Sequence, residues 1–316
     1  MTSKKKIAIA GATGFIGRWF IDTYKNQYDI VALSRKKTSF NEMMEWRMVD
    51  LFSISSSVEA LKGVDYALYL VHSMQPSTRL NQSNFEDTDL LLADNFSRAA
   101  AICNLEHIVY VGGILPKDNL NISKHLQSRY EVEQVLGSRK TPLTTIRAGI
   151  IIGPGGSSFK IIEKLVENLP IMACPKWTKS KNQPVDLRVA LKTIEEILGN
   201  PQYFNKPIEI GGEEVVTYMD VLKITAKEMK WKRWIFSVPF FSLGMSKLWV
   251  GIFSGSNSNF VSPLIESLRH EMTLNEKISI EGLPKYSLKE TIRRASDKTI
   301  KIPTFPNGIS PTKDKN

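Results

Sequence analysis

The chain has 316 residues, of which 42% are hydrophobic and 23% are charged, and this composition excludes a disordered or coiled-coil protein. The length allows one large core or two smaller ones. The formal net charge of +10 is unevenly placed, because residues 227–316 contain fifteen Lys and Arg but eight Asp and Glu. This basic part fits either a solvated face or a contact with an anionic partner. No nucleic-acid-binding motif accompanies it, so we expect no nucleic-acid partner.

The cysteines and the amino-terminal residues indicate the cellular compartment in which the protein is expected. Cys103 and Cys174 lie far apart and have no metal-ligand spacing, so we expect a reducing compartment and no metal site. The apolar run that follows Lys4-Lys5-Lys6 is too short for a signal peptide. We therefore expect a cytoplasmic protein and leave open a peripheral contact with a membrane.

The amino-terminal part follows a strand–turn–helix–strand pattern. Residues 4–10 are a charged start leading into an apolar run that predicts a buried strand, residues 18–24 predict a helix, and residues 30–33 predict a second strand. The turn is Gly11-Ala12-Thr13-Gly14-Phe15-Ile16-Gly17. Glycines at such a bend let the backbone approach a pyrophosphate, and the free N–H groups of the new helix can bind the anion. A plain turn without a ligand is the alternative, but the position between strand and helix favours a dinucleotide site.

The second strand is followed by Ser34-Arg35-Lys36-Lys37, at the position where a dinucleotide fold meets the adenosine ribose. An acidic residue there would bond the ribose 2′-hydroxyl, whereas Arg can accommodate a 2′-phosphate. Three cations and no acid therefore predict NADP (as NADPH) in preference to NAD. A role as solvated loop lysines fits Lys36 and Lys37 better than it fits Arg35.

The following elements continue the alternation of strands and helices. Strands are expected at 47–51, with Asp50 at its carboxyl end, and at 66–71, 107–111 and 142–152. Helices are expected at 58–61, at 84–103, and from a cap at Asn121 or Ser123 to Gly137. Six alternations predict an α/β fold with a doubly wound parallel sheet of the Rossmann type. His72, after the strand at 66–71, could be a catalytic acid, although packing or hydrogen bonding is the commoner use of such a residue.

The later part of the chain is less regular. Helices are expected at 159–168, 185–198 and 218–229, and a strand at 208–210 is expected to return to the main sheet. We expect residues 1–153 to form the NAD(P)-binding domain, with its sheet completed by 185–211. Residues 154–184 and 212–316 are expected to form a smaller, mostly helical region for a substrate or partner, with a loosely attached tail from about residue 301.

Residues 234–253 form a strongly apolar stretch whose length approaches the roughly 20 residues of a membrane span. Pro239, Gly244 and Lys247 interrupt it. The first interpretation is that it forms walls of an apolar substrate pocket, and the second is a contact that lies on a membrane surface. A full span is the least favoured.

Taken together, these motifs resemble the extended and atypical short-chain dehydrogenase/reductases. The run Gly11 to Gly17 is similar to their nucleotide loop, and residues 145–149 through Gly153-Pro154-Gly155 are similar to the strand and loop that carry the nicotinamide end. Residues 69–74, 147–153 and 169–177 look closest to the NmrA-related, YbjT-like branch, and related folds occur in an accessory subunit of respiratory complex I. The resemblance covers roughly residues 5–275 and implies an NAD(P)-binding protein.

The resemblance breaks at the catalytic side chains. Enzymes of this family carry a Tyr-x-x-x-Lys pair on the helix before the sixth strand, where Tyr transfers the substrate proton and Lys lowers its pKa and holds the ribose. Alignment with the family places His125 at the Tyr position and Arg129 at the Lys position, and the usual Ser falls on Gly112 or Gly113. His125 could transfer a proton near neutral pH, or it could be a half-exposed helix residue without a chemical role. Arg129 can bind a ribose or phosphate but cannot serve as acid or base.

The candidate site follows from these motifs and from the resemblance. The candidate catalytic residues are His125 and Arg129. The candidate cofactor-binding residues are Gly11, Thr13, Gly14, Phe15, Ile16, Gly17, Ser34, Arg35, Lys36, Asp50, Leu51, Val71, His72, Ser73, Gly112, Arg129, Gly149, Ile150 and Ile151.

Two functions of different classes fit this site. The first is an NADPH-dependent oxidoreductase that acts by hydride transfer on an apolar small molecule, without the usual Tyr–Lys pair. The second is a non-catalytic NADP(H)-binding sensor or an assembly or accessory protein, similar to NmrA-like proteins or to the complex I subunit. Sugar-nucleotide epimerisation ranks last because it needs the absent Tyr.

Overall fold

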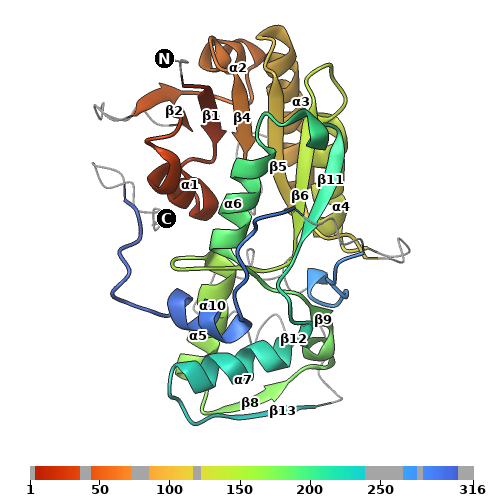
Figure 1. Ribbon diagram of the computed structural model, residues 1–316. Helices are drawn as coiled ribbons and strands as arrows, with labels where there is room; N and C mark the ends of the chain where they lie inside the picture. Colours follow the sequence, from red (N-terminus) through yellow and green to blue (C-terminus); the bar gives the residue numbers. More distant parts are fainter. Residues whose placement is uncertain are drawn as a thin grey trace, which may run out of the picture.

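The computed structural model describes residues 4–35, 44–72, 85–116, 122–238, 266–275 and 280–304. Its centre is a seven-stranded sheet in the order β11-β6-β5-β4-β1-β2-β3, in which every neighbouring pair is parallel (Figure 1). This topology confirms the expected doubly wound sheet. Its strands are β1 (Lys6–Ala10), β2 (Asp29–Ser34), β3 (Glu45–Met48), β4 (Tyr66–Tyr69), β5 (His107–Gly113), β6 (Leu143–Ala148) and β11 (Lys206–Ile210).

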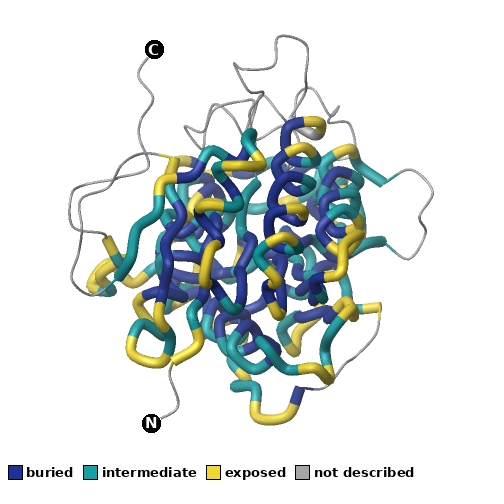
Figure 2. Tube along the Cα trace, turned by 90° about the horizontal axis from the view of Figure 1, so that it is seen from above, coloured by how far each residue is buried: buried dark blue, intermediate teal, exposed yellow. Residues whose placement is uncertain are grey.

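Helices cover both faces of the sheet. One face packs against α1 (Phe15–Tyr24) and α6 (Leu187–Ile197), and the other against α2 (Ile54–Leu61), α3 (Phe85–Ile102) and α4 (Lys124–Leu136). Strand β1 serves both cores, because successive side chains point to opposite faces: Ile7 and Ile9 enter the first, Ala8 and Ala10 the second. Figure 2 shows buried residues concentrated in the central strands and on the inner sides of these helices.

The strand expected at 142–152 is divided in the structure. Strand β6 ends at Ala148, where the pairing with both of its neighbours, β5 and β11, also ends. Beyond this point the chain has no partner in the sheet, so Ile151–Ile152 forms a separate strand, β7, that pairs with β10 (Val185–Asp186). The helix expected from 185 accordingly begins at Leu187, with Asp186 as its cap.

Other boundaries shift by a few residues. The first helix begins at Phe15 and not at 18, the third strand covers 45–48 and not 47–51, and the next helix begins at Ile54 and not at 58. Helix α4 has Ser123 as its cap, whose Oγ accepts from the Leu126 N–H at 3.3 Å. The alternative cap, Asn121, lies outside the described residues.

All but one of the remaining elements lie beyond the carboxyl edge of the sheet (Figure 1). The exception is η2, which precedes β11 at the amino edge. Among the remaining elements, β8 pairs in parallel with β13, and β9 pairs antiparallel with β12. They are α5 (Ser157–Asn168), β8 (Ile171–Cys174), η1 (Lys176–Lys179), β9 (Lys181–Asn182), η2 (Pro201–Tyr203), β12 (Val216–Thr217), α7 (Tyr218–Glu228), β13 (Trp234–Ser237) and α10 (Leu288–Ala295). The part of the apolar stretch 234–253 beyond residue 238 and the tail beyond residue 304 lie outside the described residues.

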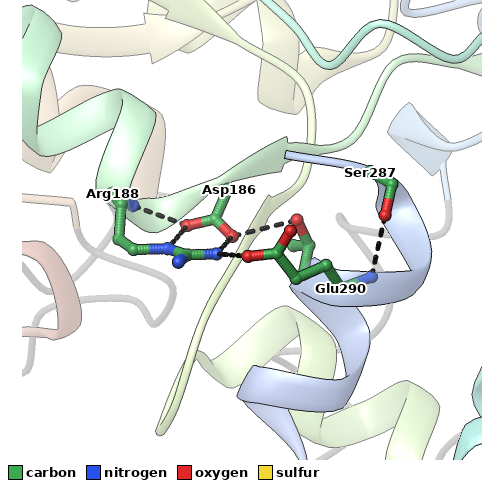
Figure 3. A network of polar contacts seen from close by, with 5 residues as sticks. Asp186, Arg188, Ser287 and Glu290 are labelled. Atoms are coloured by element: carbon green, nitrogen blue, oxygen red, sulfur yellow. Dashed lines mark hydrogen bonds and ion pairs between the residues drawn. The ribbon is translucent and has the colours of Figure 1, made fainter. Parts of the chain in front are cut away.

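A polar network attaches α10 to the beginning of α6 (Figure 3). The Asp186 carboxylate accepts hydrogen bonds from the backbone N–H of Arg188 at 2.8 Å, from the Arg188 guanidinium at 2.8 and 3.0 Å, and from the Thr291 hydroxyl at 2.9 Å. The same guanidinium donates to Glu290 of α10 at 3.1 Å and lies over the Tyr286 ring, with Cζ 3.3 Å from its centroid. Asp186 is therefore both the cap of α6 and the acceptor that holds α10.

Candidate functional site

The sheet has one topological switch point, between β1 and β4. Chain order runs outward to β2 and β3 on one side of this point and to β5, β6 and β11 on the other. In open α/β sheets, ligands bind in the crevice beyond the carboxyl ends of the strands at this point. The Gly11–Gly17 turn follows β1, and Val71 and His72 follow β4, so both segments lie at the crevice.

The glycine turn has little room for any side chain. Gly11 has φ +90°, and a Cβ there would lie 2.9 Å from the carbonyl oxygen of Leu70. A Cβ at Gly17 would lie 2.5 Å from the carbonyl oxygen of Gly11. The Gly14 N–H donates to that same oxygen at 2.9 Å, which closes the turn. Glycine is thus needed for the backbone conformation at one position and for close packing at the other.

The turn places the amino end of α1 at the crevice. Gly14 is its cap and offers no side-chain hydrogen bond, and the first turn of the helix contains no acidic residue. The backbone N–H groups of such a helix end are available to a ligand, and the helix dipole favours a negative charge there. These features fit a bound anion, such as the diphosphate of a dinucleotide.

The expected adenosine side is formed by the segments after β2 and β3, which are adjacent because Ser34 pairs with Met48. Arg35 is exposed. The Asp50 Oδ1 accepts from the Phe52 N–H at 3.2 Å, and the carbonyl of buried Leu51 accepts from the Asn95 amide at 2.9 Å. Lys36 and Ser73 lie outside the described residues.

The Gly153-Pro154-Gly155-Gly156 loop packs directly on α1. The indole N–H of Trp19 donates to the carbonyl oxygen of Pro154 at 2.9 Å, and a Cβ at Gly156 would lie 3.0 Å from the ring of Phe15. The Phe15 side chain therefore lies against this loop. The structure thus joins the glycine turn to the loop that the resemblance assigns to the nicotinamide end.

The remaining predicted residues lie at the carboxyl edge of β5 and β6. Gly112 pairs with Arg147, and a Cβ at Gly149 would lie 3.7 Å from Met272. Ile150 is buried, and Ile151 pairs with Val185 in the β7–β10 sheet. The segment 272–275 closes this edge, because the Asn275 amide donates to the Leu115 carbonyl and to Glu209 of β11, both at 2.9 Å.

Two imidazoles meet between the end of β4 and the first turn of α4. The ring centroids of His72 and His125 are 4.9 Å apart, and His72 Nδ1 lies 2.8 Å from the carboxylate of Asp89, a buried residue of α3. His72 Nε2 and His125 Nδ1 are both buried and have no hydrogen-bond partner among the residues that the structure describes. Buried polar atoms are nearly always paired in folded proteins, so these two atoms in adjacent rings are candidates for contact with a ligand.

Both imidazoles are neutral near pH 7. Burial, with the Arg129 cation nearby, lowers the pKa of His72 well below its usual range. Burial, His72 and Arg129 together lower the pKa of His125 to about 2. The neutral His72 ring therefore donates its Nδ1–H to Asp89, which leaves a lone pair on Nε2. His125 is not an imidazolium acid at neutral pH.

Arg129 and His125 lie one turn apart on α4, on the same side of the helix. The guanidinium Cζ of Arg129 lies 5.8 Å from the centroid of the Tyr110 ring, and the Tyr110 hydroxyl donates to the Arg129 carbonyl at 3.3 Å. A bidentate ion pair of Arg147 with Glu133, at 2.6 and 3.0 Å, fixes α4 to β6. The structure therefore brings His72, His125 and Arg129 together.

Asp89 is the site residue that the sequence analysis missed. It lies on the apolar side of its helix, three and seven residues before buried Leu92 and Phe96. A carboxylate in this position must find a partner, because burying an unpaired charge is costly. That pattern could have indicated Asp89 as a functional candidate.

Residues 7–169 match the NAD dependent epimerase/dehydratase family, so the chain belongs to this family of nicotinamide-dinucleotide-binding proteins. The match confirms the resemblance to the extended short-chain dehydrogenase/reductases. Among individual relatives, the auxiliary protein GraX of Staphylococcus aureus is 32% identical over 148 residues, which are 45% of this chain and 43% of that protein. The matched region thus spans less than half of that relative.

Solved structures share the fold at low sequence identity. A nucleoside-diphosphate-sugar epimerase of Staphylococcus aureus has a TM-score of 0.71 at 15% identity, covering 92% of this chain and 99% of that one. The triphenylmethane reductase of Citrobacter sp. in complex with NADP(H) has 0.69 at 17%, covering 92% and 99%. The NADPH-dependent quinone oxidoreductase of Escherichia coli in complex with NADPH has 0.68 at 17%, covering 90% and 98%.

No helix in the part of the chain that the structure describes has the length and hydrophobicity needed to cross a membrane.

Proposed function

We propose that the crevice binds NADPH and that the protein reduces an apolar small molecule by hydride transfer. The observation that carries this proposal is the pair of neutral imidazoles beside the crevice: within the described part of the chain, His72 Nε2 and His125 Nδ1 have no hydrogen-bond partner. In this desolvated place an N–H of His125 can polarise an acceptor, whereas the lone pair on His72 Nε2 can accept a hydrogen bond from the ligand.

Different residues of this chain would bind different parts of the cofactor. Gly11, Gly14 and Gly17 leave the helix end open to the diphosphate, and Arg35 would meet the 2′-phosphate of NADPH. Asp50 and Leu51 would line the adenosine side. The nicotinamide end would lie by a set of residues that share the carboxyl edge of β4, β5 and β6, namely Val71, His72, Gly112, Arg129, Gly149, Ile150 and Ile151.

The nicotinamide of bound NADPH supplies the hydride. The chain itself would orient the acceptor, exclude water and hydrogen-bond the oxygen on which negative charge develops. A neutral imidazole N–H of His125 can polarise a carbonyl, although a group with a pKa of about 2 cannot supply a proton as an imidazolium at neutral pH. Acceptors whose reduced anion is delocalised, such as quinones and enones, therefore fit this site better than simple ketones.

A second candidate function is a nucleotide-binding accessory protein that does not turn over substrate. It is favoured by the side chains at the family's catalytic positions, where His125, Arg129 and Gly112 or Gly113 stand in place of Tyr, Lys and Ser. The relative named an auxiliary protein is consistent with such a role.

Binding and turnover measurements test both functions. We expect intrinsic fluorescence titrations to give tighter binding of NADPH than of NADH, and we expect NADPH oxidation with at least one member of a panel of quinones, enones and aldehydes. His125→Phe should lower kcat by about a hundredfold, because a hydrogen bond to the developing anion is lost, and should leave NADPH affinity nearly unchanged.

Three other outcomes of these measurements would change the proposed function or the role of a residue. NADPH binding without turnover of any panel member would favour the accessory role. Tighter binding of NADH than of NADPH would contradict the role of Arg35. A protein without affinity for either dinucleotide would overturn both functions.

A further inference from the structure

The β8–β13 sheet has an apolar outer face. Ile171 of β8 and Trp234 and Phe236 of β13 are 58%, 75% and 46% exposed, and Trp231, shortly before β13, is 44% exposed. Trp234 and Ile171 pair directly in the register of the two strands. We call these four residues the aromatic face. Figure 1 shows β8 and β13 beneath α7, at the end of the molecule farthest from α2.

The inner side of the same sheet already has its partners. Met172 and Cys174 are fully buried, and with Ile235 they pack against α5 and α7 in a separate core. Because side chains alternate along a strand, the residues between them must point outward. A sheet with one face on a core usually carries polar residues on the other face. Large apolar side chains on both faces indicate a second contact.

Basic residues border the aromatic face. Lys230 and Lys232 are exposed and stand immediately before β13. The guanidinium of Arg233 donates to the carbonyl oxygens of Val166 and Glu167 at 2.6 and 3.0 Å, and its Cζ lies 4.4 Å from the centroid of the Trp231 ring. Arg233 thereby fixes Trp231 beside the end of α5.

The nearby acidic side chains do not cancel this charge. The Glu167 carboxylate lies 3.8 Å from Lys298, and Glu228 of α7, whose side chain is 8% exposed, pairs with Arg293 at 3.1 Å and with Lys289 at 3.8 Å. Each of these carboxylates therefore has a cation of its own, and Lys230 and Lys232 add positive charge at the border of the aromatic face.

We propose that the aromatic face docks on the surface of an anionic lipid bilayer. Trp side chains favour the boundary between headgroups and acyl chains, because they have a large apolar ring and one polar N–H. Lysines beside them are attracted by anionic headgroups, and the two contributions together suit a protein that lies on a membrane without crossing it. The positive charge at the border argues for this occupant over a neutral apolar partner.

Vesicle flotation tests the docking with the full chain. We expect the protein to float with vesicles of phosphatidylcholine and phosphatidylglycerol, to float poorly with phosphatidylcholine alone, and to be released at high salt. Lys230→Gln and Lys232→Gln should each weaken binding about fivefold. Trp234→Ser combined with Phe236→Ser should abolish flotation.

Ile102→Ser is the matched control. Ile102 is 60% exposed and ends α3, which precedes the amino end of β5, so it lies at the opposite edge of the sheet from β8 and β13. The Ile102→Ser variant should float with the vesicles to the same extent as the unsubstituted protein. All variants should keep their NADPH affinity, so the lipid contact and the cofactor site can succeed or fail separately.

Two results would overturn the proposal. The first is equal flotation with and without phosphatidylglycerol, or none with either vesicle. The second is a concentration-dependent dimer in light scattering that Trp234→Ser with Phe236→Ser removes, because the face would then belong to a second copy of the chain.

Discussion

At the scale of single residues, His107 shows how a buried imidazole can be fully satisfied in one protonation state. Its Nε2 lies 2.8 Å from the Thr144 hydroxyl, and its Nδ1 accepts from the Gly199 N–H at 3.0 Å. The Thr144 hydroxyl donates to the Tyr203 carbonyl at 2.6 Å, so the hydrogen between Thr144 and His107 must come from the imidazole. A second proton, on Nδ1, would face the Gly199 N–H.

His107 therefore links stability to pH. Burial lowers its pKa from 6.5 to about 4, so the unfolded chain binds a proton that the folded chain does not over this range. The stabilisation is complete above the unfolded pKa and is lost as the pH falls from about 6.5 to about 4, up to about 3 kcal/mol. We expect the unfolding free energies in urea at pH 7.5 and at pH 5 to differ by about 2 kcal/mol because of this group.

His107→Gln provides the comparison. Gln offers one acceptor and one donor without titrating, so the difference in unfolding free energy between the two pH values should shrink by about 2 kcal/mol. The other buried imidazoles, His72 and His125, remain in both proteins and contribute equally. The same pH dependence in both proteins would show that His107 is not the titrating group.

At the scale of secondary-structure elements, α1 is the element on which cofactor binding depends. Its cap, Gly14, is exposed and has an extended backbone conformation that Asp and Asn also adopt. A Cβ there would lie 3.1 Å from the Gly11 carbonyl oxygen, a close contact that the two variants would share. Both are good helix caps, and they differ by one negative charge. They therefore separate the stability of the helix from its affinity for an anion.

We expect Gly14→Asp to bind NADPH at least about tenfold more weakly than Gly14→Asn, because its carboxylate would compete with the diphosphate for the helix end. Fluorescence titration measures the affinity. Thermal melting without nucleotide should show the Asp variant to be at least as stable as the Asn variant, since an anion favours this end of a helix. Equal affinities would place the diphosphate elsewhere.

At the scale of the whole molecule, the sequence was informative wherever structure is determined by neighbouring residues. The β1–α1–β2 unit could be predicted, because an apolar run, a glycine turn and a helical pattern follow one another along the chain. The division of the 142–152 segment into β6 and β7 could not be predicted, because it depends on where β5 and β11 end. The very short strands beyond the sheet could not be predicted either, because they pair residues that are far apart in the sequence, such as Ile171 with Trp234.

In the candidate site, too, the local motifs could be predicted and the long-range contacts could not. The glycine turn and the basic segment after β2 are local motifs that the sequence displays directly. The contact of His72 with His125 and Asp89 joins the segment after β4 to α4 and α3, and only the fold brings these residues together. The separation into a nucleotide-binding domain and a smaller region remains a prediction.

Contacts between these two parts predict that they unfold as one unit. Asp186 holds α10 against α6, Trp19 of α1 bonds the loop before α5, and Asn275 bonds Glu209 of the sheet. We expect a single urea transition, with coincident curves from far-ultraviolet circular dichroism and from tryptophan fluorescence, which reports on both parts because Trp19 and Trp177 lie in different ones.

The Asp186 network should be a measurable part of this coupling. Asp186→Ala removes the cap of α6 and leaves the Thr291 hydroxyl and the Arg188 guanidinium without their shared acceptor, so we expect a loss of about 2 to 4 kcal/mol in unfolding free energy. In Asp186→Asn the amide oxygen can keep the cap bond that Oδ1 accepts from the Arg188 N–H, and the NH2 in the place of Oδ2 can donate to the Thr291 hydroxyl, so this variant should lose less than half as much. Equal losses would mean that only the charge pair with Arg188 matters.

The number of unfolding transitions tests the coupling itself. Two separate transitions in the Asp186→Ala variant alone would show that this carboxylate makes the two parts cooperative. Two transitions in the unsubstituted protein would contradict the coupling.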